Sequence, residues 1–239
     1  MKSWIRFDKY PSFWCPGCGI GIMNNHIAMA FHELGLNKKD VVIVSGIGCS
    51  GRTAGYFNCD SVHGPHGRAV AIAEGVKRGN PKLKVVVISG DGDLLGIGGN
   101  HLMHTARRNV DITVICYNNE IYGMTGGQMA PTTKKDMYTV TSPFGNVYEP
   151  INMQKLISSN NKYWFGRTSV WSVDHLKKVV KEAVAYEGFS FVEVVGYCIT
   201  NNGVRVGFKD AHSMLMDIKK RYKVGEMDSV YSLGVVKSQ

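Results

Sequence analysis

Residues 84–93 read KVVVISGDGD and residues 111–119 read DITVICYNN, and these two stretches decide the fold. Each is a short run of apolar, mostly β-branched residues, which is typical of a strand buried on both faces of a parallel sheet. Each run ends in polar residues or glycine, and a helical pattern over residues 98–108 separates the two. The pattern therefore predicts a strand, helix and strand whose polar ends lie side by side at one edge of a sheet.

The same alternation extends in both directions along the chain. Further strands are predicted over 41–45 and 189–195, and further helices over 19–36, 68–78 and 173–187. We expect an α/β fold, a doubly wound parallel sheet in a single domain over residues 1–239. Residues 124–163 are rich in Thr, Pro, Gly and Asn with little periodicity, which predicts a long functional loop.

The composition argues against several classes of protein. No apolar run approaches the roughly 18 residues of a membrane span, and the first residues lack the apolar stretch of a signal peptide. We therefore expect a soluble cytoplasmic protein. The net charge of +9 comes from basic residues scattered through the predicted helices, not gathered in an arm, which argues against nucleic acid. An acidic protein partner such as a small ferredoxin fits this charge.

The polar ends of the two deciding strands carry the ligands that a magnesium diphosphate needs. Mg²⁺ prefers hard oxygen ligands in octahedral geometry. The carboxylate of Asp91, the amide oxygen of Asn119 and the backbone carbonyl of Ile121 are the candidates. Two unrelated turns are the alternative, because a bare Gly-Asp-Gly is common in turns. The Asn-Asn pair ends the next predicted strand, so it would lie beside Asp91. This position favours the metal site over two unrelated turns.

A second group of candidate ligands consists of cysteines. Four thiolates can hold a cubane iron–sulfur cluster, and four thiolates around zinc are the nearest competitor. A Cys-x-x-Cys pair, one cysteine in a glycine loop and one after the last strand supply the set Cys15, Cys18, Cys49 and Cys198. Cys116 lies inside an apolar strand and is interpreted as a core residue. Cys59 stays open as an alternative to Cys198.

Two other functions compete with this interpretation. Residues 46–51 read GIGCSG and match the dinucleotide fingerprint after a strand. That fingerprint needs a helix directly after the glycines and an acidic residue about 20 positions on, whereas here Arg52 and a cluster of His, Gly and Pro follow. The other competitor is an electron-transfer subunit that carries a cluster and binds no thiamine.

The motifs together resemble the beta subunits of 2-oxoacid:ferredoxin oxidoreductases. The segments that carry the resemblance are CPGCG (15–19), GIGCS (46–50), HGPHGR (63–68), GDGD (90–93), RRN (107–109) and YGMTGGQ (122–128). They occur in the order of that family and span the chain from about residue 10 to 210. The resemblance implies the thiamine-diphosphate-binding type of α/β domain, with a cluster-binding N-terminal segment over about 10–20 and a C-terminal extension over about 199–239.

The resemblance also implies which residues bind the cofactors. Thiamine diphosphate would contact Ile47, Gly48, Cys49, Ser50, His66, Gly92, Asp93, Gly123 and Met124. Mg²⁺ would be bound by Asp91, Asn119 and Ile121, and a [4Fe-4S] cluster by Cys15, Cys18, Cys49 and Cys198. His63 is a weaker candidate than His66, because a histidine in such a loop can simply hydrogen-bond a backbone carbonyl.

The reaction implied is oxidative decarboxylation of a 2-oxoacid to acyl-CoA and CO2, with electrons leaving through the cluster to ferredoxin. A partner alpha subunit would supply the glutamate that contacts the aminopyrimidine, and gamma and delta subunits are further candidates. The Thr-Gly-Gly-Gln run over 125–128 resembles the 2-oxoglutarate and branched-chain branches of the family. We expect 2-oxoglutarate as the substrate, with branched-chain 2-oxoacids and pyruvate as alternatives. His66 and Arg52 are the candidate catalytic residues. Arg52 would pair with the distal carboxylate of the substrate, or else neutralise the diphosphate or face solvent.

Overall fold

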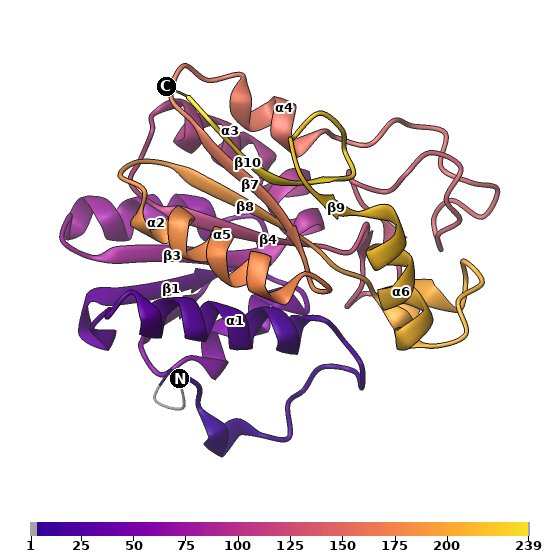
Figure 1. Ribbon diagram of the computed structural model, residues 1–239, viewed down its shortest axis with the longest axis horizontal. Helices are drawn as coiled ribbons and strands as arrows, with labels where there is room; N and C mark the ends of the chain where they lie inside the picture. Colours follow the sequence, from indigo (N-terminus) through magenta and orange to yellow (C-terminus); the bar gives the residue numbers. More distant parts are fainter. Residues whose placement is uncertain (1–3, 239) are drawn as a thin grey trace.

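The structure of the protein is a computed structural model that describes residues 4–238. Within this range a sheet of eight strands forms the middle layer, and helices cover both of its faces (Figure 1). The strands lie in the order β2-β1-β3-β4-β8-β7-β10-β9. Their bounds are β1 Val41–Ser45, β2 Asp60–His63, β3 Lys84–Gly90, β4 Thr113–Asn118, β7 Trp164–Ser169, β8 Ser190–Val195, β9 Lys223–Val224 and β10 Ser232–Lys237. A separate hairpin pairs β5 Ile121–Tyr122 with β6 Gln128–Met129.

The strands from β2 to β7 in this order run parallel. The predicted doubly wound parallel sheet is therefore confirmed. At one edge the C-terminal segment adds β10, which runs antiparallel to β7 and pairs in parallel with β9. The strands after residue 220 were not predicted; they make the expected C-terminal extension part of the same sheet.

The helices divide between the two faces of the sheet. On one face α1 Ile20–Glu33 and α5 Val173–Ala185 pack side by side, and α6 Ala211–Arg221 joins the same apolar cluster. On the other face lie α2 Ala69–Gly79, α3 Gly99–Arg107 and α4 Met153–Ser158. Strand β4 serves both clusters, because alternate side chains of a strand point to opposite faces: Ile115 and Tyr117 to one, Val114 and Cys116 to the other. This explains why the middle of the strand, residues 114–117, is apolar.

Helix α5 illustrates how the pattern of apolar residues is used. Its buried residues Leu176, Val179, Val180 and Ala183 recur at helical spacing and are at most 1% exposed. Burial of one such Leu or Val side chain contributes roughly 1.5–3 kcal/mol. The lysines between them stay towards solvent, so the helix has one apolar face that packs on the sheet and on α1.

The elements missed by sequence reasoning lack a continuous apolar run. Strand β2 is an edge strand whose residues are largely exposed. Strand β7 contains Arg167, which is buried because its Nε lies 2.7 Å from Oε2 of Glu193 in the adjacent strand. The expected long loop over 124–163 is irregular through most of its length, but it also contains β6 and α4. None of the helices between residues 4 and 238 is long and apolar enough to cross a membrane.

Candidate active site

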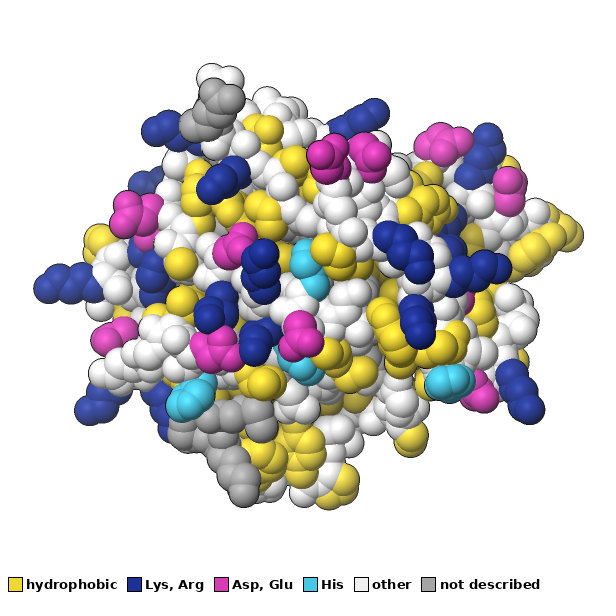
Figure 2. Space-filling view, viewed as in Figure 1, with side chains coloured by type: hydrophobic (Ala, Val, Ile, Leu, Met, Phe, Trp, Pro, Cys, Tyr) yellow, Lys and Arg dark blue, Asp and Glu magenta, His cyan; other side chains and the backbone are white. Residues whose placement is uncertain are grey.

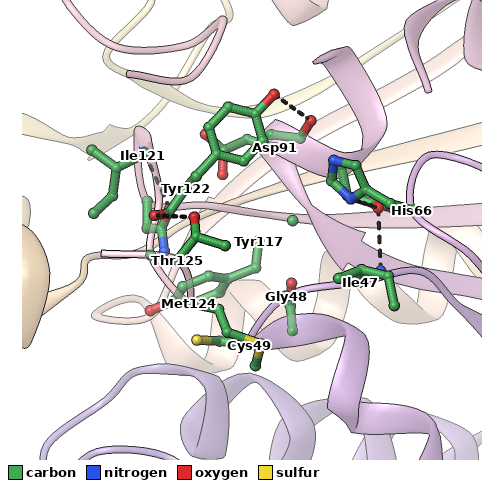
Figure 3. Close-up of a pocket in the computed structure, with 16 residues that line it drawn as sticks. Ile47, Gly48, Cys49, His66, Asp91, Tyr117, Ile121, Tyr122, Met124 and Thr125 are labelled. Carbon is green, nitrogen blue, oxygen red and sulfur yellow. Dashed lines mark hydrogen bonds and ion pairs between the residues drawn. The ribbon is translucent and has the colours of Figure 1, made fainter. Parts of the chain in front are cut away.

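The carboxyl ends of β1, β3 and β4 meet at one edge of the sheet and form a pocket there with the turn that follows β4 (Figure 3). Every residue predicted to contact thiamine diphosphate or Mg²⁺ borders this pocket. The full lining is Ile47, Gly48, Cys49, Ser50, His66, Gly90, Asp91, Gly92, Asp93, Tyr117, Asn119, Ile121, Tyr122, Gly123, Met124 and Thr125. Segments far apart in sequence are thus brought together as strand ends in a parallel sheet.

Asp91 is the buried carboxylate of this pocket. Asp91 is 1% exposed, and the hydroxyl of Thr132 donates a hydrogen bond to its Oδ2. Within residues 4–238 it forms no ion pair with a Lys, Arg or His. Burial raises the pKa of Asp91 to about 7, although hydrogen bonds from Thr132 and from the backbone at Asn119 act in the opposite direction. A carboxylate in this position favours binding of a cation.

Asp93 joins three loops of the pocket. Its carboxylate accepts hydrogen bonds from Ser89 Oγ at 2.8 Å, from the backbone NH of Gly67 at 2.7 Å and from that of Ile47 at 3.2 Å. In addition, Nδ1 of His66 lies 2.7 Å from Asp93 Oδ1. Asp93 therefore holds the loop after β1, the loop after β2 and the end of β3 in one arrangement. His66 Nδ1 is within ion-pair distance of this carboxylate but has no hydrogen-bond partner among the described residues.

Two glycines are required here by close approach. A Cβ atom at Gly46 would lie 2.0 Å from Oδ2 of Asp93, so any other residue would displace that carboxylate. A Cβ atom at Gly92 would lie 2.4 Å from the ring of Tyr122. A short π-helical turn, Gly92–Ile97, begins directly after Asp91 and is followed by α3. It lies nearer to the pocket than the helix start that was expected near Gly98.

The turn after β4 closes the pocket on its other side. Asn119 Oδ1 accepts a hydrogen bond from the backbone NH of Ile121 at 3.3 Å, and the hydroxyl of Tyr122 donates to the carbonyl of Gly92 at 3.1 Å. Sequence reasoning missed Tyr122 and Thr132 as site residues. Tyr122 begins a motif that was recognised, so its position was available, whereas Thr132 lies in a stretch without periodicity and only the fold brings it to Asp91.

A second cavity adjoins the first, and the four predicted cluster ligands border it. Its volume is about 180 Å³, and its lining includes Cys15, Cys18, Cys49 and Cys198. It shares Cys49, Asn119, Gly123 and Met124 with the first pocket. The indole NH of Trp14 donates to the carbonyl of Cys49 at 2.8 Å and fixes the N-terminal segment against the loop after β1. The two predicted sites are therefore neighbours in one cleft.

The four thiols influence one another. Burial raises the pKa of Cys18 and of Cys49 to about 11, and neighbouring cysteines contribute to both shifts. The described residues contain no group of three or more His, Cys, Asp or Glu side chains arranged to hold a metal ion. Zinc would bind each sulfur at about 2.3 Å and so draw all four onto one point. The four cysteines border one cavity, where four thiolates could hold zinc or an iron–sulfur cluster.

Comparison with known proteins identifies the family to which the chain belongs. A family model described as thiamine pyrophosphate enzyme, C-terminal TPP binding domain, matches residues 46–194. The 2-oxoglutarate synthase subunit KorB of Methanothermobacter thermautotrophicus is 41% identical over 220 residues, which cover 91% of this chain and 76% of that protein. The chain belongs to the beta subunits of 2-oxoacid:ferredoxin oxidoreductases. It is thus a subunit of an oxidoreductase complex with a thiamine diphosphate domain.

A second relative and a solved structure support the same family assignment for this beta subunit. KorB of Methanocaldococcus jannaschii is 44% identical over 204 residues, covering 84% of this chain and 74% of that protein. Among solved structures, a 2-oxoglutarate:ferredoxin oxidoreductase from Magnetococcus marinus, with 2-oxoglutarate, coenzyme A and succinyl-CoA bound, has a TM-score of 0.88 at 28% identity. The match covers 100% of this chain and 84% of the other.

The two remaining cysteines of the beta subunit lie elsewhere. Cys116 is fully buried in β4, as its apolar surroundings predicted, and burial raises the pKa of its thiol well above the usual value. Cys59 lines a different hollow, together with Ile5 and Leu36. Cys198, not Cys59, therefore shares a cavity with the other three predicted ligands.

Arg52 and His63 lie outside the residues that line the two cavities. Arg52 is exposed, and its Cζ lies 5.6 Å from the ring centroid of Phe13. Nδ1 of His63 is 2.9 Å from the carbonyl oxygen of Gly51, the backbone contact that was the plain alternative for this residue. Both border a third hollow on the outer side of the loop after β1.

The first pocket is small for a complete cofactor site. Its volume is about 80 Å³, whereas sites for whole small molecules usually measure about 300–1,000 Å³. It has room for a diphosphate with its cation beside Asp91. The remainder of a thiamine molecule would have to extend towards the cysteine cavity and beyond this chain.

Proposed function

We propose that this chain catalyses, with partner subunits and in the cytoplasm, the thiamine-dependent oxidative decarboxylation of 2-oxoglutarate. The products would be succinyl-CoA and CO2, with electrons passing through a [4Fe-4S] cluster to ferredoxin. The observation that carries the proposal is the shared cleft: the diphosphate pocket and the four-cysteine cavity have Cys49, Asn119, Gly123 and Met124 in common. Such sharing would make the path from cofactor to cluster short.

The polar end of the cleft would hold Mg²⁺ and the diphosphate. Asp91 would supply a carboxylate oxygen, Asn119 an amide oxygen and Ile121 a backbone carbonyl, which are the ligand types Mg²⁺ prefers. The buried and unpaired state of Asp91 supports this role, because a divalent cation would favour its charged form. When bound, thiamine diphosphate supplies the carbon nucleophile and the electron sink that decarboxylation requires.

The cysteine cavity would hold the cluster. Four thiolates are the usual ligands of a [4Fe-4S] cluster, and these four come from the N-terminal segment, the loop after β1 and the segment after β8. Trp14 and Tyr197 stiffen this end: Tyr197 donates a hydrogen bond from its hydroxyl to the carbonyl of Gly17 at 2.8 Å. The ligand loops are thus tied to the rest of the fold.

His66 is the residue of this chain proposed to act on the reacting groups. Nδ1 of His66 lies 2.7 Å from Oδ1 of Asp93, within ion-pair distance but without a hydrogen-bond partner in the part of the chain that the structure describes, and His66 borders the pocket. A histidine in this place is suited to hydrogen-bond a developing oxyanion or a diphosphate oxygen.

Partner subunits would complete the site. The pocket of about 80 Å³ is too small for the whole cofactor, which supports an alpha subunit that contacts the aminopyrimidine through a glutamate. The relatives are named as subunits, in agreement with a complex. Gamma and delta subunits and a ferredoxin are the further partners we propose, and coenzyme A is the acyl acceptor.

The proposal is tested by assembling the complex anaerobically and assaying it with 2-oxoglutarate, 2-oxoisovalerate and pyruvate. We expect coenzyme A-dependent reduction of an acceptor with 2-oxoglutarate as the best substrate, and a brown protein with about four irons per beta subunit. Turnover with a branched-chain acid above that with 2-oxoglutarate would overturn the substrate assignment. A colourless, iron-free complex that remains active would overturn the cluster.

A further inference from the structure

The N-terminal segment and Arg52 form a surface beside the two cavities of the proposed site. We propose that it is the docking surface for an acidic iron–sulfur electron carrier, an inference that rests on the proposed function. We call it the carrier surface, and it consists of Arg6, Phe7, Lys9, Tyr10, Phe13 and Arg52. Figure 2 shows hydrophobic side chains at the lower edge of the molecule, where the N-terminal segment lies in Figure 1.

Three aromatic side chains are held outward on this surface. Phe7 is 51% exposed, Tyr10 40% and Phe13 50%. Large exposed aromatic side chains are enriched in protein–protein interfaces and are uncommon on surfaces that face only water. Phe7 and Tyr10 contact each other with ring centroids 5.7 Å apart, so they form one patch.

The segment is ordered in spite of this exposure. The backbone NH of Arg6 donates to the carbonyl of Tyr56 at 2.9 Å, and that of Phe13 donates to the Tyr56 hydroxyl at 2.9 Å. Ile5 forms a bridge with Phe57, and the rings of Trp14 and Tyr56 lie 4.4 Å apart. These contacts hold the aromatic side chains in place before a partner arrives, which lowers the entropy cost of binding.

The charge of the surface selects the partner. Arg6, Lys9 and Arg52 border one hollow of about 500 Å³, which Phe13 and His63 also line. Asp8 and Asp60 line the neighbouring hollow, and the carboxylate of Asp8 lies 3.6 Å from Arg6 and 3.9 Å from Lys9. Three cations against these two carboxylates leave the surface positive, in keeping with the net charge of +9. A partner with an acidic face is therefore favoured, and its encounter would be accelerated by the opposite charge.

The position of the surface identifies the partner as an electron carrier. Phe13 borders both the basic hollow and the cysteine cavity, and Cys15, two residues further on, is exposed. A carrier seated on this surface would bring its own cluster next to the proposed one. Each decarboxylation releases two electrons, so the cluster would pass one electron at a time and reduce two one-electron centres of oxidised carrier.

The test is a charge reversal in the assembled complex. The double variant Arg6→Glu with Lys9→Glu is compared with Lys82→Glu plus Lys162→Glu as a matched control. Lys82 and Lys162 are exposed, precede β3 and β7, and line neither hollow beside the carrier surface. Two acceptors are used with the 2-oxoacid: an acidic two-cluster ferredoxin, and methyl viologen, which needs no docking surface.

We expect the Arg6 and Lys9 reversal to lower kcat/KM for ferredoxin about tenfold or more and to flatten its dependence on salt, while the rate with methyl viologen is unchanged. The control variant should match the unmodified complex with both acceptors. A loss of equal size in the control, or an unchanged ferredoxin rate in the test variant, would overturn the docking surface.

Direct binding separates this inference from the proposed function. Ferredoxin binding to the complex is measured by calorimetry at 20 mM and 300 mM salt, without any 2-oxoacid. Binding that weakens in the Arg6 and Lys9 variant supports the surface even if the 2-oxoacid assay fails. A variant that no longer assembles with its partner subunits would show that a subunit, not a carrier, covers this surface, and would overturn the inference.

Discussion

Two buried carboxylates of this protein lie in opposite electrostatic environments. Glu74 in α2 accepts hydrogen bonds from Arg108 Nε at 3.0 Å, from Arg78 Nη2 at 2.8 Å and from Thr105 Oγ1 at 2.8 Å. These partners, Arg108 foremost, lower its pKa to about 2. Asp91 is also buried, but it forms no ion pair with any cationic side chain within residues 4–238. Desolvation raises the pKa of Asp91 to about 7.

The difference separates a charge that the chain itself neutralises from one for which we propose a functional role. Glu74 is neutralised by the chain itself and joins α2 to α3, so it stabilises the fold. Asp91 has hydrogen bonds but no countercharge, so its ionised form is costly until a cation binds. Perturbed carboxylates in clefts are typical of functional sites, and here the kind of partner distinguishes the two roles.

The largest effect should come from Asp91. We expect Asp91→Ala to weaken Mg²⁺-dependent binding of thiamine diphosphate more than about 100-fold, beyond the loss typical of residues that only orient a metal ligand. The fold should be retained, because the loss of the hydrogen bond from Thr132 is offset by removal of a buried carboxylate that lacks a countercharge. Calorimetric titration and thermal unfolding measure the two, with Asp91→Asn to preserve the volume. Unchanged cofactor affinity in Asp91→Ala would contradict the assignment of Asp91 as a Mg²⁺ ligand.

A matched pair of cysteines extends the comparison. Cys49→Ala should abolish the proposed cluster, because Cys49 borders the cavity, while Cys116→Ala should keep it, because Cys116 is buried in β4. Iron analysis and the visible spectrum of anaerobically purified complex decide between them. A bleached Cys116→Ala protein together with a brown Cys198→Ala protein would show that the ligand set is wrong.

Arg52 should have an effect that depends on the substrate if it binds the distal carboxylate. Arg52→Leu would then lower kcat/KM for 2-oxoglutarate by roughly tenfold or more relative to an apolar 2-oxoacid, through loss of a charge-assisted pair. Its exposed position over Phe13 is the reason to measure both substrates. Equal loss for both would assign Arg52 to the cofactor instead, and no loss would leave it to the surface.

The smallest effect should come from Glu74. Glu74→Gln should lower the free energy of unfolding by about 1–3 kcal/mol at pH 7, with unchanged cofactor binding. Because the pKa of Glu74 is lower in the folded state than its ordinary value of 4.5, its contribution is present above pH 4.5 and is lost as the pH falls towards 2. Urea unfolding of both proteins should therefore converge at low pH; a difference that persists there would contradict the ionic origin.

Sequence reasoning succeeded where local pattern and chemistry coincide. The apolar runs of β1, β3, β4 and β8, and helical periodicity as in α5, predicted the parallel core. Parallel strands expose their carboxyl ends at one edge, so the residues after β1, β3 and β4 were expected to form one site, and they line one pocket. The assignment of ligands from residue type stays a prediction: oxygen ligands suit Mg²⁺ and thiolates suit iron–sulfur clusters.

Only the tertiary structure decided the features that depend on contacts between distant segments. The choice of Cys198 over Cys59 in the cysteine cavity, the bond from Thr132 to Asp91 and the burial of Arg167 by Glu193 have no local signature. The edge strand β2 and the strand β10, which lies between β7 and β9, were missed because pairing with neighbours, not an apolar run, holds them in the sheet. Local sequence determines which elements form, whereas packing determines which side chains meet across them.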